Sequence, residues 1–110
     1  MKIHKITYKN GMIKNLNEKE KIPAYFFDEN SLPDNILDLM KQTKIIELGG
    51  TYGDPKAGNP IQYDHLTIEH DEGTTTIEAF NISIFLLFAE DPYIKKVFQV
   101  LIQFQLLVRK

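Results

Sequence analysis

Residues 63–80 constrain the fold most strongly, because they alternate in the way that paired β-strands alternate. In the first half, Leu66 and Ile68 face one way and the polar residues between them face the other. Residues 71–73 (Asp-Glu-Gly) then supply a tight connection, with glycine where a left-handed backbone is needed. Residues 74–80 return as a segment rich in β-branched side chains. We therefore expect an antiparallel hairpin here.

The amino terminus predicts another hairpin. Residues 3–9 alternate, residues 10–11 (Asn-Gly) are a strong two-residue turn, and residues 12–13 continue as strand. Residues 22–27 also have strand character, and Pro23 places them at a sheet edge or at the start of a ladder.

A helix is expected after this strand. Ser31 can accept hydrogen bonds from free backbone N–H groups, Pro33 suits the first turn, and Asp34 complements the positive end of the helix dipole. The residues that follow place an apolar stripe on one helix face: Leu32, Ile36, Leu37, Leu39 and Met40.

Residues 94–108 fit two patterns. Apolar and polar residues alternate over part of the segment, as in a strand, while polar residues also recur at the three- and four-residue spacing of a helix. The preceding Asp91 and Pro92 are a capping acid and a proline at the first helical position. This start favours a helix, with a strand as the alternative.

The expected order is therefore ββα-loop-ββα in a single α+β domain over residues 1–110, with an antiparallel four-stranded sheet and two helices. A length of 110 residues, 43% of them hydrophobic, suits one domain. No cysteine is present, which excludes disulfides, a thiol nucleophile and cysteine-ligated metals. The start lacks a signal-peptide core, and the longest apolar run, 84–89, is far too short to cross a bilayer. We expect a cytoplasmic protein without membrane contact.

The charge is unevenly distributed although the net charge is only −2. Residues 1–21 are rich in lysine, whereas residues 63–93 carry acids and no lysine or arginine. The single arginine is Arg109, and arginine is the residue best suited to bidentate phosphate and base contacts. A nucleic-acid partner is therefore disfavoured, and the acidic stretch is suited to steering a basic partner.

Enzyme chemistry has one candidate location. His65 and His70 lie among carboxylates, as metal ligands often do: Asp64, Glu69, Asp71 and Glu72. On a strand, positions 65 and 70 point to opposite faces, so a site would need a distant ligand such as His4. No nucleophile elbow or phosphate-binding glycine motif is present. We expect no catalytic residue, metal or cofactor, with a small metal-dependent or hydrolytic enzyme as the alternative.

Residues 49–62 form a long glycine- and proline-rich segment, predicted to be a loop. Such loops are either connectors or binding surfaces, and both interpretations stay open. As a binding loop it would present Tyr52 as an anchor, with polar contacts from Asp54, Lys56 and Asn59. Replacement of Tyr52 by alanine would then weaken binding and leave the melting temperature nearly unchanged.

Residues 82–108 are more apolar than a two-layer domain of this size needs. Residues 82–88 must be buried by this chain or by another. If residues 94–108 form a helix, it is apolar nearly all round, and such a helix is buried on more than one side. We therefore expect a homodimer with a symmetric interface. Val97, Leu101 and Phe104 are the candidate interface positions.

The layout resembles that of emfourin-type proteins, which are small intracellular bacterial inhibitors of thermolysin-like metalloproteases. The resemblance lies in the first hairpin, the helix that opens at Leu32 and Pro33, the glycine-containing loop, the strand at 63–68 and the helix led by Pro92. It implies a non-catalytic protein-binding module whose partner is another protein, such as a metalloprotease.

Overall fold

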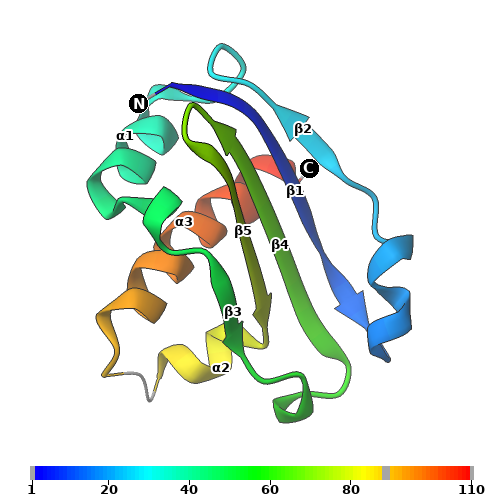
Figure 1. Cartoon of the computed structure of the whole chain (residues 1–110). Helices are drawn as coiled ribbons and strands as arrows, with labels where there is room; N and C mark the ends of the chain where they lie inside the picture. Colours follow the sequence, from blue (N-terminus) through cyan, green and yellow to red (C-terminus); the bar gives the residue numbers. More distant parts are fainter. Residues whose placement is uncertain (1, 88–89, 110) are drawn as a thin grey trace.

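The computed structural model describes residues 2–87 and 90–109, which form an α+β fold around one five-stranded sheet (Figure 1). The strands are β1 (Ile3–Ile13), β2 (Tyr25–Phe27), β3 (Gly50–Gly53), β4 (Ile61–His70) and β5 (Gly73–Phe80). The α-helices are α1 (Asp34–Thr43), α2 (Ile82–Leu86) and α3 (Pro92–Val108). Short 3-10 helices are η1 (Leu16–Lys21), η2 (Ile45–Glu47) and η3 (Pro55–Ala57).

The expected antiparallel four-stranded sheet with two helices is wrong. The strand order is β2-β1-β4-β5-β3, and β3 runs parallel to β5 while the other neighbours are antiparallel. The additional strand lies inside residues 49–62, the predicted loop, and α2 and the 3-10 helices are additional helical elements. β3 has four residues, two of them glycine, so only its pairing with β5 reveals it as a strand.

The predicted turn at Asn10 and Gly11 is also wrong, because both residues lie inside the eleven-residue strand β1. Asn10 is paired with Asp64 and donates from Nδ2 to its Oδ1 at 3.0 Å. At Gly11, an added Cβ would lie 3.3 Å from the side chain of Ile22, which packs over the strand. Contacts distant in sequence therefore use these two residues in place of a local turn.

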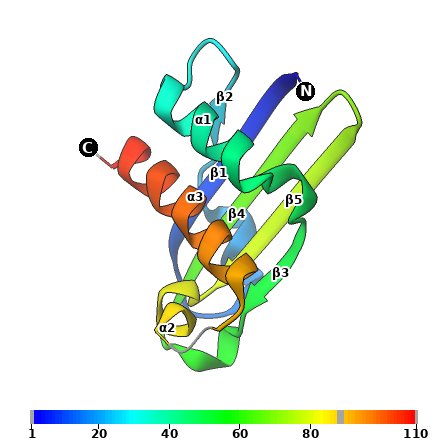
Figure 2. The same cartoon turned by 90° about the vertical axis from the view of Figure 1, so that its left-hand side faces the viewer.

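Helices α1 and α3 pack on one face of the sheet, as Figures 1 and 2 show together. The main core lies between these layers. Its completely buried members, each 0% exposed, come from β1, β4, β5, α3 and the start of α2: Ile6, Tyr8, Leu66, Ile68, Ile77, Ala79, Ile82, Val97, Val100, Leu101 and Phe104. Tyr52 of β3 packs against this core.

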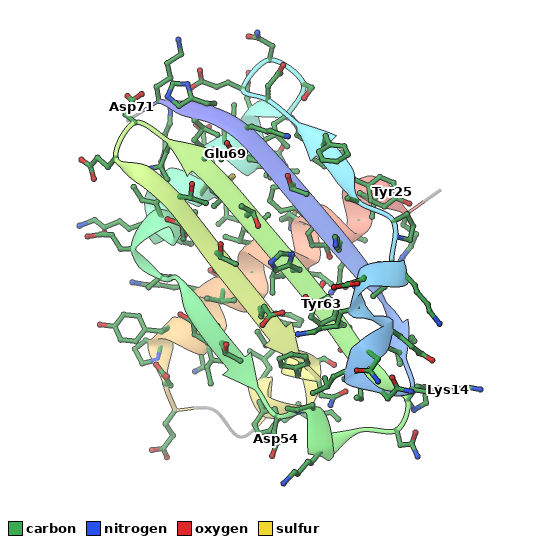
Figure 3. The ribbon with its side chains drawn as sticks, turned by 45° about the vertical axis from the view of Figure 1, so that its right-hand side comes forward. Lys14, Tyr25, Asp54, Tyr63, Glu69 and Asp71 are labelled. Carbon is green, nitrogen blue, oxygen red and sulfur yellow. The ribbon has the colours of Figure 1, made fainter. Side chains whose placement is uncertain are left out.

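The opposite face of the sheet is covered at one end. The chain from η1 to Ile22 lies over a smaller apolar cluster formed by Ile13, Ile61, Tyr63 and Phe80. Lys19 of η1 lies 3.3 Å from the Glu78 carboxylate. Figure 3 looks onto this face, with Tyr63 beside η1 and Glu69 farther along the sheet.

The two predicted helix starts differ in outcome. Asp91 caps α3 by accepting a hydrogen bond from the Tyr93 N–H at 2.8 Å, which confirms a helix over residues 92–108 and excludes the strand alternative. Helix α1 begins at Asp34 with Pro33 at the N-cap position and no side-chain cap. The predicted cap, Ser31, instead accepts from the Asp28 N–H at 2.8 Å and closes the preceding turn.

This chain alone buries the apolar run 82–88 only in part. Ile82 is completely buried, but Ile84 is 42% and Leu87 is 81% exposed. Phe88 lies outside the described residues. Within the described ranges, no helix combines the length and the apolar character needed to cross a bilayer.

Candidate functional site

The four predicted contact residues follow one another from the edge strand β3, through η3, to the connection before β4. Tyr52 is half-buried, packs against the main core and donates its hydroxyl to the Leu48 carbonyl at 2.6 Å. Burial, with the nearby charge of Asp91, raises the pKa of Tyr52. Because Tyr52 supports the fold in this way, we expect its replacement by alanine to lower the melting temperature, unlike the replacement of a purely exposed contact residue.

The other three contact candidates are exposed. Asp54 caps η3, since its Oδ1 accepts from the Lys56 N–H at 2.9 Å. Lys56 and Asn59 follow on the solvent side of the same segment. Tyr52 therefore stabilises the fold, and Asp54, Lys56 and Asn59 are the candidates whose side chains are exposed to a partner.

Strand β3 has one free edge, because β5 is its neighbour on one side and it ends the strand order on the other. The Asp54 N–H donates to the Phe80 carbonyl of β5 at 3.1 Å. Backbone groups of successive strand residues point alternately to the two sides, so those of Tyr52 face β5 and those of Thr51 face outward. Unpaired backbone groups at an edge form a template for another strand.

Asn81 fixes this segment, although the sequence analysis did not select it. Its Nδ2 donates to the Asp54 carbonyl at 2.9 Å, and its Oδ1 accepts from the Gln62 N–H at the same distance. Asn81 is buried and has a positive φ of 53°, a conformation that asparagine tolerates better than most residues. An asparagine directly after a predicted strand was the available signal. One side chain therefore ties both ends of the η3 connection.

A cleft of about 420 Å³ lies beside β3. It combines the end of α1, η2, the start of β3 and the first turns of α3. Its lining residues are Thr43, Lys44, Glu47, Leu48, Gly49, Tyr52, Tyr93 and Lys96. The cleft thus offers aromatic rings and lysine side chains next to an unpaired strand edge.

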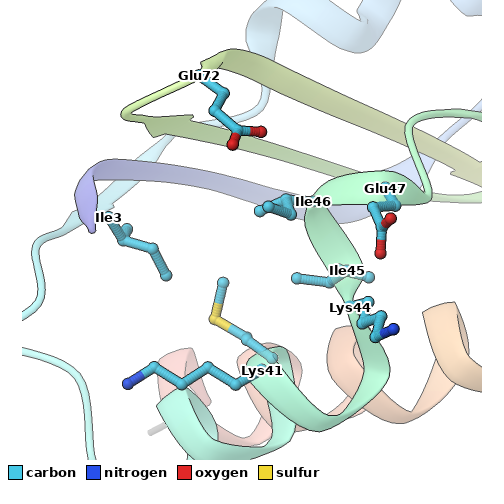
Figure 4. Close-up of a pocket in the computed structure, with 8 residues that line it drawn as sticks. Ile3, Lys41, Lys44, Ile45, Ile46, Glu47 and Glu72 are labelled. Carbon is cyan, nitrogen blue, oxygen red and sulfur yellow. The ribbon is translucent and has the colours of Figure 1, made fainter. Parts of the chain in front are cut away.

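A second cleft, of about 400 Å³, lies between the end of α1 with η2 and the far end of the sheet (Figure 4). Its wall is mainly apolar, with Ile3, Met40, Ile45 and Ile46, and its charged lining residues are Lys41, Lys44, Glu47 and Glu72. Lys44 and Glu47 line both clefts.

The structure does not bring the two histidines together. His70 contacts the Thr75 hydroxyl at 2.9 Å, whereas His65 lies on the opposite face of β4, stacked on Tyr63. Burial lowers the pKa of His65, and its Nδ1 has no hydrogen-bond partner among the described residues. Among the described residues, no three histidines or acids are grouped so that they could hold a metal ion. Asp64, which the alternative enzyme would need, is completely buried.

Asp64 belongs to a polar cluster inside the core. Its Oδ1 accepts from the Tyr8 hydroxyl at 2.6 Å, from Asn10 at 3.0 Å and from Gln105 at 3.1 Å. Burial raises the pKa of Asp64, and the three hydrogen bonds oppose this shift. The cluster joins β1, β4 and α3.

The candidate interface positions Val97, Leu101 and Phe104 lie in the core of the chain itself and are 0% exposed. A second copy could not contact them while α3 stays packed on the sheet. Homodimerisation stays a prediction, and exposed apolar side chains such as Phe26 and Leu87 are the ones available to a partner.

Comparison with known proteins gives no family model, curated protein or solved structure that matches the chain.

Proposed function

We propose that the chain is a non-catalytic protein-binding module that binds its partner along the 49–62 segment. The observation that carries this proposal is the free edge of β3, where the backbone groups of Thr51 face outward beside the 420 Å³ cleft. An extended peptide that joins such an edge gains main-chain hydrogen bonds, and pockets for alternate side chains give specificity.

The rigidity of this edge supports the same conclusion. Gly53 has a φ of +80°, and an added Cβ would lie 1.9 Å from the Phe80 carbonyl oxygen, so the strand end is closely packed on β5. The Asn81 side chain holds the chain that follows. A preformed edge loses little conformational entropy on binding, which favours affinity.

Thermolysin-like metalloproteases are the partner class to test first, because the emfourin resemblance implies it. The chain would act on such an enzyme as an inhibitor. It would inhibit the enzyme by binding it at the edge of β3 and would catalyse no reaction itself.

The experiment compares the unmodified chain with Thr51→Pro and with its matched control Thr51→Val. Proline removes the outward N–H without removing a hydrogen bond to β5, and valine keeps both the N–H and the β-branched shape. Each protein is immobilised and exposed to a bacterial lysate, and each is also added to thermolysin during peptide cleavage.

We expect the unmodified chain and the valine variant to retain the same protein and the proline variant to lose it at least tenfold. Equal retention by all three chains would exclude the β3 edge as the contact. Retention of no protein would exclude a binding module, and unchanged thermolysin cleavage would exclude inhibition of that enzyme.

A further inference from the structure

Two acids near the free edge of β3 accept hydrogen bonds, whereas the lysines there form no ion pair with a described residue. Lys44 and Lys96 line the cleft, and Lys56 follows β3 in η3; none of the three is within 4.0 Å of a carboxylate in the part of the chain that the structure describes. Two nearby acids are already engaged with backbone N–H groups, because Asp54 caps η3 and Asp91 caps α3.

Among the described residues that line the cleft, Glu47 is the one acid, and Lys44 and Lys96 are the two cations. A carboxylate that caps a helix keeps its charge, but its oxygens are partly occupied by the backbone N–H groups from which they accept. The charged side chains that line the cleft itself are therefore two lysines and one glutamate, so the lining carries a net positive charge.

The geometry of strand addition directs alternate side chains of an added peptide toward this cleft. Tyr52 projects to the helix-covered side of the sheet and lines the cleft. Every second side chain of a strand paired along the free edge would project to the same side. Such a side chain would lie between the ends of α1 and α3, where Lys44 and Lys96 are.

We propose that the peptide bound at β3 carries an acidic side chain, aspartate or glutamate, that enters this cleft and pairs with Lys44 and Lys96. This inference rests on the proposed function, since it requires strand addition at β3. The aromatic rings of Tyr52 and Tyr93 provide an apolar surface for the methylene groups of that side chain.

A substitution at Lys44 can separate an effect on ligand binding from an effect on stability. It is the C-cap of α1 and has a positive φ of 56°, a position at which glycine is the usual residue. Lys44→Gly relieves the left-handed strain, so this variant keeps or gains stability while the cleft loses a cation. A weaker complex with an unimpaired fold would assign Lys44 to the ligand.

The experiment uses blocked hexapeptides of alternating threonine and valine with one central glutamate, glutamine or lysine. Each is titrated into the full chain, and backbone amide shifts are followed by NMR. The variants are Lys44→Gly and Lys96→Gln. Lys95→Gln is the matched control, because it removes the same charge from the neighbouring exposed residue, which does not line the cleft.

We expect the glutamate peptide to shift the amides of residues 50–53 and to bind threefold to fivefold more tightly than the glutamine peptide, as for a partly exposed ion pair. Lys44→Gly and Lys96→Gln should remove this preference, and Lys95→Gln should keep it. Equal binding of the three peptides would refute the proposed acidic side chain but would not contradict strand addition at β3. No shift at residues 50–53 with any peptide would overturn both.

Discussion

The hydrogen bond from Tyr8 to Asp64 allows a quantitative test of how the sheet and α3 are joined. Both side chains are 0% exposed, and the donors to the carboxylate are neutral groups of Tyr8, Asn10 and Gln105. No cation of the described residues lies within 4.0 Å of Asp64. Tyr8→Phe removes the shortest of these hydrogen bonds and changes the side-chain volume little.

The expected cost follows from the charge of the acceptor. A hydrogen bond to an ionised group contributes about 1.5–3 kcal/mol, against about 0.5–1.5 kcal/mol for a neutral pair. We therefore expect Tyr8→Phe to lower the free energy of unfolding by about 2 kcal/mol at pH 7. For a chain of this size, this corresponds to a fall in melting temperature of about 8 °C.

The assay is urea unfolding of both proteins between pH 4 and pH 8, with Tyr25→Phe as control because Tyr25 is 38% exposed. Since burial raises the pKa of Asp64, the carboxyl becomes protonated as the pH falls, and the cost of Tyr8→Phe should shrink to about 1 kcal/mol. A cost that is the same at every pH, or below about 0.5 kcal/mol at pH 7, would refute a buried ionised acceptor.

Three further predictions test other parts of the structure. The pKa of Asp64 is raised in the folded state, so folding favours the protonated carboxyl. As the pH rises above the ordinary pKa of 3.8 and through the raised pKa, the unmodified chain should lose stability relative to Asp64→Asn. Urea unfolding of both proteins measures this difference. Tyr52→Ala should cost about 2 kcal/mol, from a lost hydrogen bond and lost apolar burial, and calorimetry would show it as a lower melting temperature. Leu101→Glu should prevent soluble expression because it places a charge in the core, whereas Leu106→Glu, at a 53% exposed position, should remain soluble and folded. A soluble, folded Leu101→Glu protein would contradict the packing of α3.

The parts of the fold that the sequence predicts are those whose signals are local. The alternation of residues 63–80 gives the β4–β5 hairpin, and Asp91 with Pro92 gives the start of α3. Each of these signals acts within a few residues of the structure that it specifies. No distant partner has to be known for them to be interpreted correctly.

The first strand shows the opposite situation. Asn10 and Gly11 are a turn pair when taken alone, but Asn10 bonds to Asp64 and Gly11 gives room to Ile22. Both partners are far enough along the chain that the local pattern contains no trace of them. Tertiary contacts decided between two conformations that the residues themselves allow.

The sequence selected residues 49–62 as the candidate segment, but it did not predict the structure of that segment. Glycine and proline content marked residues 49–62 as a connection and identified Tyr52, Asp54, Lys56 and Asn59, without indicating that part of the segment pairs with β5. The role of Asn81 could not be predicted either, because it depends on hydrogen bonds to residues 27 and 19 positions earlier.

The absence of local strand character in β3 bears directly on the proposed function. In this four-residue strand with two glycines, Tyr52 is the side chain that packs on the core, so the position of β3 also depends on backbone pairing with β5 and on the Asn81 anchor. Within the described ranges, no strand pairs with the other side of this backbone, to which the groups of Thr51 point. Long apolar edge strands invite aggregation, whereas a short edge without an apolar side-chain pattern limits nonspecific pairing. Selectivity must then come from side chains beside the edge, and the cleft with Lys44 and Lys96 is in the position to provide it.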